Sequence, residues 1–440
     1  MKINALKGMK DILPKEQRLR DYVQKMILET YRASGFERIS TPMLEDAENL
    51  DKSEGGDNLN LIFKVLKRGE KLASALDAEN VDEKSLSDMG LRYDLTLPLT
   101  RFYSAHRNEL PNPFKVIQTD RVFRAERPQR GRSREFVQCD IDIIGDKSCN
   151  AEVELIDVTA RAILSLNFMQ FTDYLTIKIN DRKILRNMLE TMGFPKESLD
   201  SVCITFDKLD KIDIEGVKKE LEEKNMPEKA IKTLVNFFMD IPASIRDNNK
   251  LEYQYSLNDV LPYCSDPSIL NDIKYIIDTV NKISDNKYRI QYCPTLVRGQ
   301  GYYTGVVFEI QCSGLNFDSA IGGGGRYDNL IGKFTNETIP AVGFSIGFER
   351  LCMILSENNY EIPVEKEKIA LIYNDNDSFY NVITDAGNLR KKNYSVSIIK
   401  KAKNPAHQYD MLKSQGYSQA VMYGSDGTLI FKQIQPRESE

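Results

Sequence analysis

The chain has 440 residues, of which 41% are hydrophobic and 28% charged, and its net charge is −5. This composition is typical of a soluble globular protein with two or three domains and argues against a surface coated in basic residues. No apolar run follows a basic N-terminal start, and no apolar stretch approaches the ~18 residues of a membrane span, so neither secretion nor membrane insertion is expected.

Seven cysteines occur singly along the sequence, and only two histidines, His106 and His407, are present. Scattered cysteines in odd number indicate reduced, mostly buried thiols, which favours a cytoplasmic protein. Two histidines argue against a histidine-rich metal site and against an imidazole-based catalytic triad. No metal ligands are therefore predicted.

The N-terminal part of the chain predicts alternating helices and strands. Apolar residues recur at helical spacing in residues 15–33, a segment that follows Pro14 and ends before Gly35. Further helices are expected at residues 98–105, 150–166 and 182–192, strands at 36–42, 61–66, 91–97 and 174–179, and loops at 51–60 and 79–88.

Residues 121–145 (RVFRAERPQRGRSREFVQCDIDIIG) are the most informative stretch. Six arginines and no lysine lie within its first fourteen residues, together with a proline and a glycine that predict a loop. The alternating runs 114–123 and 136–144 predict strands on either side. Because a planar guanidinium group suits bidentate binding of phosphate or carboxylate, the hairpin is a candidate anion site. A solvated hairpin tip is the alternative.

Residues 194–271 differ in composition from what precedes them. They are rich in Lys, Glu and Asp, with helical periodicity and little strand–turn punctuation. We interpret this segment as a helical insertion between two halves of one sheet domain. Contact with a large substrate and a purely structural role both remain open.

Residues 296–310 (LVRGQGYYTGVVFEI) lead into a β-rich run. The two glycines around Gln300 allow close backbone approach or positive φ. On an extended chain the adjacent Tyr302 and Tyr303 would face opposite sides, so only one of them is expected to face a ligand.

Two further glycine-containing stretches follow. Residues 320–330 (AIGGGGRYDNL) match neither the P-loop nor the dinucleotide fingerprint. Their glycines indicate a phosphate cradle, a surface on which a small ligand lies flat, or a flexible hairpin tip. Residues 341–355 (AVGFSIGFERLCMIL) predict a strand that passes into an apolar helix, with Arg350 near the helix start, where backbone N–H groups favour phosphate.

The C-terminal segment follows a polar linker and predicts a small α/β domain. Strands are expected at 369–373, 394–399, 420–423 and 428–432, and helices at 378–391 and 407–415. Basic residues cluster at 390–392 and 400–403, which indicates either a modest nucleic-acid footprint or a solvated face.

Taken together, these stretches resemble the histidyl-tRNA synthetases, a family of class II aminoacyl-tRNA synthetases. Residues 15–42 resemble motif 1, FRAERPQRGRSREFVQCDIDIIG motif 2 and GFSIGFERL motif 3, while LVRGQGYYTGVVFEI and GGGGRYDNL resemble the histidine-specific motifs, and KGMKDILP and LRYDLTLP also match the family. The resemblance covers nearly the whole chain. It implies an α+β fold, with a class II synthetase-type antiparallel sheet flanked by helices, a helical insertion and a small C-terminal α/β domain. The implied division is a catalytic core at 1–193 and 272–356, the insertion at 194–271, a linker at 357–367 and an anticodon-binding-like domain at 368–440.

The resemblance implies a ligase that uses ATP to convert L-histidine to histidyl-adenylate and then transfers histidine to tRNA(His). In the family pattern Arg124 and Arg298 are the catalytic residues, which grip the α-phosphate from two sides. Arg350 holds the γ-phosphate of a bent ATP. Glu126 accepts from the adenine amino group, and Phe136 stacks on the adenine ring.

The same resemblance implies a histidine pocket with acceptors for the ammonium group and partners for both imidazole nitrogens. Near the ammonium group the family pattern puts Asp94, Thr96 and Gln138. Around the imidazole ring it puts Asp142, Tyr303 and Tyr327, with Tyr302 as a further candidate. Buried polar groups of this kind reject amino acids that leave them unpaired.

Magnesium accompanying the ATP and a homodimer formed through motif 1 are also implied. Two alternatives stay open: a synthetase-like, histidine-binding regulatory subunit of ATP phosphoribosyltransferase, and a non-catalytic tRNA-binding paralogue. Retention of Arg124, Arg298 and Arg350 favours the ligase. The chain departs from the family at Gln300 and Gly301, where many members have Leu-Asp, and in a C-terminal domain that looks short for anticodon reading.

Overall fold

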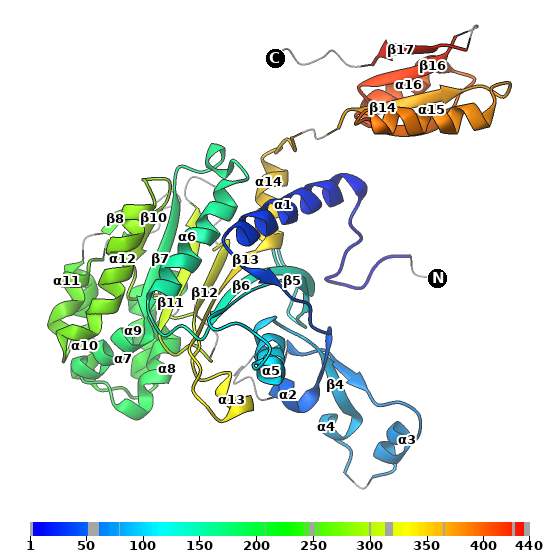
Figure 1. Ribbon diagram of the computed structural model, residues 1–440. Coiled ribbons are helices and arrows are strands. Elements are labelled where there is room, and N and C mark those ends of the chain that lie inside the picture. Colours follow the sequence, from blue (N-terminus) through cyan, green and yellow to red (C-terminus); the bar gives the residue numbers. More distant parts are fainter. Residues whose placement is uncertain are drawn as a thin grey trace. The chain divides into compact units, whose positions relative to one another are not determined.

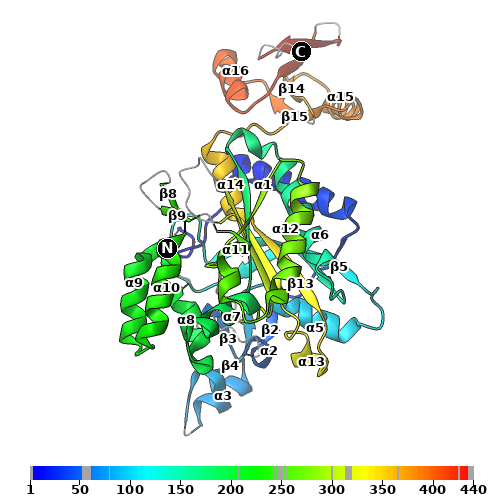
Figure 2. The same ribbon diagram turned by 90° about the vertical axis from the view of Figure 1, so that its left-hand side faces the viewer.

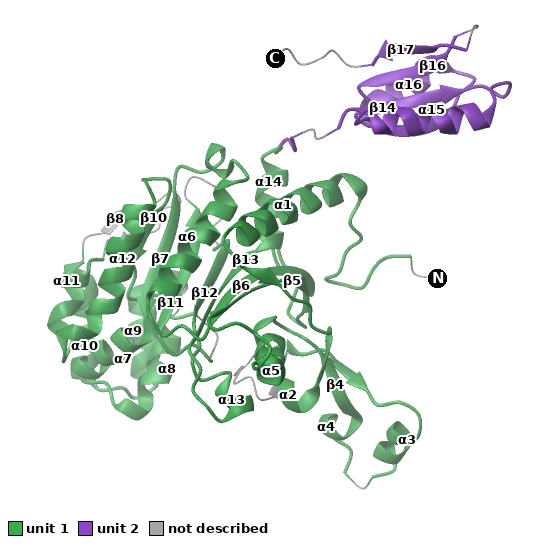
Figure 3. Cartoon of the chain, in the orientation of Figure 1, with its two compact units in different colours: residues 1–360 green, residues 361–440 purple. Residues whose placement is uncertain are grey.

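The computed structural model describes residues 3–51, 61–78, 80–206, 208–241, 243–245, 251–253, 255–298, 301–312, 320–363, 366–424 and 427–434. The chain divides into two compact units, Met1–Tyr360 and Glu361–Glu440, which are coloured separately in Figure 3. No helix among these residues combines the length and the apolar character that crossing a bilayer requires.

The first unit is built on a large, mostly antiparallel sheet. In the described residues its strand order is β1-β5-β6-β13-β12-β11-β7-β10. The central pairs are antiparallel, while the outer pairs β1–β5 and β7–β10 are parallel. The strands are β1 (Glu37–Arg38), β5 (Phe114–Phe123), β6 (Glu135–Ile144), β7 (Leu175–Asp181), β10 (Arg289–Tyr292), β11 (Val306–Cys312), β12 (Gly322–Arg326) and β13 (Ala341–Gly347).

Helices α6 (Asn150–Leu164), α12 (Asn271–Ile283) and α14 (Phe348–Glu357) pack against this sheet, and α1 (Pro14–Ala33) packs against α6 and α14. Helix α6 contacts β13 and both α1 and α12, α14 contacts β6 and α1, and α12 contacts β10 (Figure 1). Successive side chains of a strand accordingly face the helices and the opposite side of the sheet in alternation. Cys139, Ile141 and Ile143 of β6 are fully buried beneath these helices, and the residues between them face the other side of the sheet.

A smaller sheet precedes β5 in the sequence. It pairs β4 (Ser87–Leu91) with β2 (Leu44–Asp46) and β3 (Lys64–Leu66), and is accompanied by α2 (Ala47–Asp51), α3 (Glu70–Leu76), α4 (Glu83–Leu86) and α5 (Thr96–His106). The loop predicted at 79–88 and the strand predicted at 91–97 are therefore wrong. In residues 79–88, a capping box between Asp82 and Ser85 starts the helical turn α4. In residues 91–97, the backbone N–H of Leu97 donates to Asp94 Oδ1 (3.2 Å) where α5 begins.

Helices dominate the segment between β7 and β10. Besides α12, they are α7 (Arg182–Met192), α8 (Leu199–Phe206), α9 (Leu209–Glu223), α10 (Glu228–Asp240) and α11 (Leu257–Val260), with the hairpin β8 (Ala243–Ile245) and β9 (Leu251–Tyr253). Helices α9 and α10 lie side by side and contact each other (Figure 2). Arg182 begins α7 where it was predicted, and Asp181 caps it by accepting from the N–H of Lys183 (2.7 Å).

The second unit is a small α/β domain. Its sheet has the order β15-β14-β16-β17, with parallel pairs β14–β15 and β14–β16 and an antiparallel edge strand β17. The elements are β14 (Lys368–Tyr373), α15 (Phe379–Lys391), β15 (Ser395–Lys400), α16 (Pro405–Ser414), β16 (Gln419–Tyr423) and β17 (Leu429–Gln433). Each predicted strand and helix of this segment forms within two residues of its expected bounds.

Candidate active site

A cleft of about 590 Å³ opens on the face of the large sheet that the helices leave free. Strand β6 supplies one wall, because Phe136, Gln138, Asp140 and Asp142 alternate along it and face the cleft. All the site residues predicted from the sequence line this one cleft: Asp94, Thr96, Arg124, Glu126, Phe136, Gln138, Asp142, Arg298, Tyr302, Tyr303, Tyr327 and Arg350. Segments more than two hundred residues apart in the sequence thus meet at one site.

Arg124 directly follows β5. Its Nε donates to the carbonyl oxygen of Tyr93 (2.9 Å), and its guanidinium carbon stands 5.1 Å from the centroid of the Phe136 ring. Its Nη1 lies 4.0 Å from a carboxylate oxygen of Glu126. A cation and an aromatic face thus stand together at the mouth of the arginine-bearing hairpin, where a nucleotide base and a phosphate could both be held.

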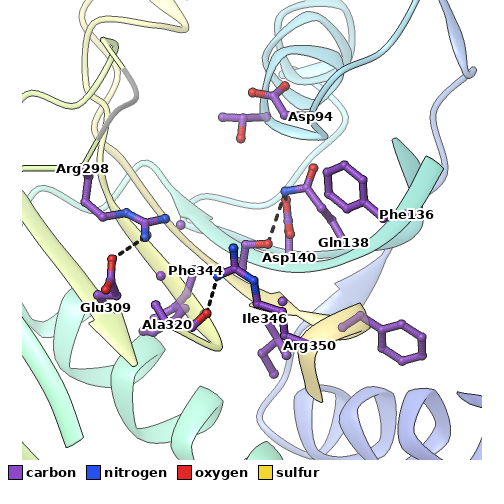
Figure 4. A pocket seen from close by; sticks show the side chains of 18 of the residues that line it. Asp94, Phe136, Gln138, Asp140, Arg298, Glu309, Ala320, Phe344, Ile346 and Arg350 are labelled. Carbon is purple, nitrogen blue, oxygen red and sulfur yellow. Dashed lines mark hydrogen bonds and ion pairs between the residues drawn. The ribbon is translucent and has the colours of Figure 1, made fainter. Parts of the chain in front are cut away.

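Arg298 lies across the cleft from β6. Its Nη1 pairs with Glu309 Oε2 of β11 at 2.9 Å (Figure 4). Burial alone would lower the pKa of this guanidinium, but Glu309 and Tyr303 raise it above its ordinary value, so the group stays charged. The backbone of Arg298 has φ +60°, a left-handed conformation that is costly for a residue with a side chain. Such strain in a cleft residue is typical of functional sites.

Arg350 lies in the first turn of α14, where its Nη1 donates to the carbonyl oxygen of Ala320 (Figure 4). Burial, followed by the neighbouring Arg132 and Arg298, lowers the pKa of this guanidinium. Within the described residues Arg350 makes no ion pair with a carboxylate. A partly buried cation beside other cations is an environment that a bound anion would stabilise.

The floor of the cleft holds a buried tyrosine–carboxylate pair. Tyr327, which is 1% exposed, donates its hydroxyl hydrogen to Asp142 Oδ1 at 2.6 Å. Burial raises the pKa of Asp142 to about 7, the Tyr327 hydroxyl lowers it, and Asp94 raises it. Gly343 of β13 makes room for this carboxylate, because a Cβ atom there would lie 1.9 Å from Asp142 Oδ1.

The two adjacent tyrosines both line the cleft. Their ring centroids are 5.0 Å apart, and the Tyr302 hydroxyl lies 3.5 Å from Thr96 Oγ1. The prediction that only one of them faces the cleft is therefore wrong. It assumed an extended chain, whereas residues 301–302 form a turn and β11 begins only at Val306. Gln300 lies outside the described residues.

The glycine run is a sheet strand, not a hairpin tip. Gly322–Arg326 is β12, hydrogen-bonded between β11 and β13. The Arg298 guanidinium lies against it, and a Cβ atom on Gly323 would be 2.6 Å from Arg298 Cζ. The run therefore leaves space for a cationic side chain over the sheet, which is one use of glycine within a strand.

Several cleft residues were missed in the sequence, among them Glu309, Asp140 and Ser345. Glu309 orients Arg298, Asp140 lies on β6 between two predicted residues, and Ser345 of β13 accepts from Gln138 Nε2 at 3.3 Å. Asp140 could have been found from the alternation of Gln138 and Asp142 in a predicted strand. Glu309 was signalled by a single charge in the apolar run VVFEI.

The family model described as histidyl-tRNA synthetase matches residues 8–351. The chain belongs to the histidyl-tRNA synthetase family. It is 36% identical over 439 residues to the histidine–tRNA ligase of Leifsonia xyli subsp. xyli, covering 99% of this chain and 98% of that protein. It is 35% identical over 428 residues to a probable histidine–tRNA ligase of Tropheryma whipplei (strain Twist), covering 96% of each.

The chain is also similar in fold to solved structures. The crystal structure of histidyl-tRNA synthetase from Nostoc sp. PCC 7120 matches with a TM-score of 0.77 at 24% identity, over 98% of this chain and 97% of that one. A structure described as an ATP phosphoribosyltransferase regulatory subunit/histidyl-tRNA synthetase from Bacillus halodurans C matches with a TM-score of 0.71 at 20% identity, over 96% and 97%. The predicted α+β fold of a histidyl-tRNA synthetase family member is confirmed.

Proposed function

We propose that this protein is a histidine–tRNA ligase, which activates L-histidine with ATP and transfers it to tRNA(His). The activity is supported by relatives named histidine–tRNA ligase, which this chain matches along nearly their whole length. The observation that carries the proposal for the site is that Arg124, Arg298 and Arg350 line the same cleft as the Asp142–Tyr327 pair. Such a cleft offers cations for a triphosphate beside acceptors for an amino acid.

In the proposed reaction the carboxylate of histidine attacks the α-phosphorus of ATP and pyrophosphate leaves. Negative charge builds up on the α-phosphoryl oxygens, so fixed cations at that position lower the barrier. We assign Arg124 and Arg298 to the α-phosphate. Arg350 is assigned to the γ-phosphate, since it lies at a helix start and makes no ion pair with a carboxylate among the described residues.

The adenine ring is assigned to the region of Phe136 and Glu126. The ring of Phe136 offers a stacking face, and the carboxylate of Glu126 offers an acceptor for the exocyclic amino group. The guanidinium carbon of Arg124 lies 5.1 Å from the centroid of the same Phe136 ring.

The amino acid is assigned to the floor of the cleft. Asp142 and Tyr327, with Tyr303 and Tyr302 beside them, surround the imidazole ring, because a carboxylate and phenols can pair with both ring nitrogens. Asp94, Thr96 and Gln138 accept from the ammonium group. A side chain without two such nitrogens would leave Asp142 or Tyr327 unpaired, which is how the pocket would reject it.

Magnesium would enter with the ATP phosphates. Glu309 is the carboxylate at the phosphate end of the cleft that could contribute an oxygen, which is the ligand type that magnesium prefers. We also propose a homodimer formed through the motif 1 segment, tRNA(His) as the nucleic-acid partner and the cytoplasm as the compartment. The last is in keeping with seven free cysteines.

The regulatory-subunit alternative is not favoured. A similarity at 20% identity to a structure with that name concerns the fold alone. Arg124, Arg298, Arg350 and the C-terminal unit are features that a histidine-binding protein without ligase activity does not need.

Histidine-dependent exchange of pyrophosphate into ATP tests the activation step, and charging of tRNA(His) tests the transfer. We expect both reactions, with no exchange when histidine is omitted or replaced by another amino acid. Folded protein that binds histidine but supports no exchange would favour the regulatory or tRNA-binding alternatives. Exchange without charging would limit the proposal to adenylation.

A further inference from the structure

Asp140 is a buried carboxylate in the cleft to which the proposed reaction gives no role. It lies on β6 between Gln138 and Asp142 and opposite Ser345 of β13. The residue is only 5% exposed, and its Oδ1 atom is buried without a hydrogen-bond partner among the described residues. Because an unpaired buried carboxylate oxygen costs free energy, a ligand group that donates hydrogen bonds to it would stabilise the site.

Two more acceptors in the cleft are in the same condition. Asp94 Oδ2 and Gln138 Oε1 are also buried, and neither has a partner in the part of the chain that the structure describes. The carboxylates are near enough to act on each other, since burial, then Asp142, and then Asp94 raise the pKa of Asp140 well above its ordinary value. Figure 4 shows Asp94, Gln138 and Asp140 around the same space.

The number and type of these atoms define the ligand group. Three unpaired acceptors, two of them on carboxylates, match the three N–H donors and the positive charge of a primary ammonium. Gln138 Nε2 is already engaged, since it donates to Asp140 Oδ2 (3.5 Å) and to Ser345 Oγ (3.3 Å). The Gln138 amide is thereby turned so that its oxygen is left for the ligand.

We propose that Asp140 is a substrate-binding residue, which accepts a hydrogen bond from the α-ammonium group of the amino acid together with Asp94 and Gln138. This inference rests on the proposed ligase function and adds to it. Asp140 makes the pocket selective for a cationic amino group, because only a cation stabilises the ionised form of a second buried carboxyl group.

The test compares two ligands by titration calorimetry, without magnesium and in the presence of EDTA: L-histidine and 3-(imidazol-4-yl)propionate, which lacks only the ammonium group. In D140N the affinity for histidine should fall roughly 10- to 100-fold, as expected for the loss of a charge-assisted hydrogen bond. The affinity for the propionate should change by less than about threefold, since this ligand has no donor for Asp140.

The matched control is D181N. Asp181 is also a buried carboxylate, 8% exposed, with its pKa raised to about 6 by burial, but it lies on β7 and does not line the cleft. D181N should bind both ligands as the wild-type protein does. If D140N does not fold, D140G carries the same comparison, because it removes the side chain and leaves no new buried polar atom.

Three results would overturn the inference. Equal weakening of both ligands would mean that Asp140 only packs the site, and unchanged histidine binding would mean that it does not touch the substrate. A failure of the wild-type protein to bind histidine would overturn both the inference and the ligase proposal. Wild-type protein that binds histidine without pyrophosphate exchange would count against the ligase alone, and the two-ligand comparison would still decide the role of Asp140.

Discussion

The guanidinium carbon of Arg298 lies directly over Gly323, so that a Cβ atom on this glycine would stand 2.6 Å from it. Glycine within a strand normally weakens a sheet. Here its missing side chain leaves the space in which Arg298 reaches Glu309 from a strained backbone with φ +60°. The glycine of one motif and the arginine of another therefore form a single structural unit.

This relationship predicts that G323A displaces Arg298. Since a shift of about 1 Å in a catalytic group can cost about 100-fold, the rate of histidine-dependent pyrophosphate exchange should fall by roughly 10- to 100-fold. G387A is the control, because a Cβ atom on Gly387 of α15 meets nothing within 4 Å. Normal exchange by G323A would show that the position of Arg298 does not matter for activation.

R298A should remove a preorganised cation from the transition state. We expect kcat for exchange to fall by about 100- to 1,000-fold, which is about 3–4 kcal/mol of barrier, while the Kd for histidine stays within about threefold. R298A also leaves Glu309 without its partner. The double variant R298A/E309Q should therefore regain thermal stability but not activity. Wild-type turnover in R298A would reject the assigned role.

Asp142 should make the stability of the ligand-free protein depend on pH. Its pKa is about 7 instead of 3.8, mainly because of burial. Between about pH 4 and pH 7 the folded protein holds a proton that the unfolded chain has lost, so stability decreases as the pH rises through this range. The whole effect corresponds to about 4 kcal/mol.

In D142N the side chain at this position cannot ionise, so the variant does not lose this stability as the pH rises. Its melting temperature relative to the wild-type protein should rise as the pH is raised from about 5 to about 8, as measured by thermal shift. Parallel curves for the two proteins over that range would contradict the raised pKa. Histidine binding by D142N should be weaker, because an uncharged amide oxygen is a weaker acceptor for the imidazole N–H than a carboxylate.

The ion pair between Arg20 of α1 and Glu349 of α14 should be important for stability. It is bidentate, at 2.7 and 2.6 Å, and largely buried, and Glu349 Oε1 also accepts from the backbone N–H of Val137 in β6. R20M would leave this carboxylate buried without its cation, so we expect a loss of about 3 kcal/mol in chemical denaturation. R107A, which breaks the exposed pair with Glu337, should change stability little.

Long, strongly patterned segments were predictable from the sequence. Phe114–Phe123 forms with the predicted bounds, and α7 and the C-terminal α/β unit also form close to theirs. The failures lie in short segments, residues 79–88 and 91–97. Residues 91–97 have an alternating pattern, but α5 begins at Thr96, where the backbone N–H of Leu97 donates to Asp94 Oδ1 and the Leu97 side chain is buried.

The site was predictable where a motif carries it and was missed where sheet pairing creates it. Arg124, Arg298 and Arg350 could be named from their motifs. Asp140 and Ser345 become neighbours only through the register of β6 with β13, and Glu309 reaches Arg298 only because β11 lies beside the glycine strand. Tyr302 faces the cleft because of a turn that apolar patterning does not reveal.

The wall formed by β6 has a consequence for how this pocket could evolve. Phe136, Gln138, Asp140 and Asp142 reach the cleft only because they share the parity of one pleated strand. Deleting a single residue in the middle of this strand would turn the side chains on one side of the deletion towards α6 and α14. Point substitutions at these four positions can therefore change the ligand preference. Insertions and deletions within the strand would instead destroy the pocket wall.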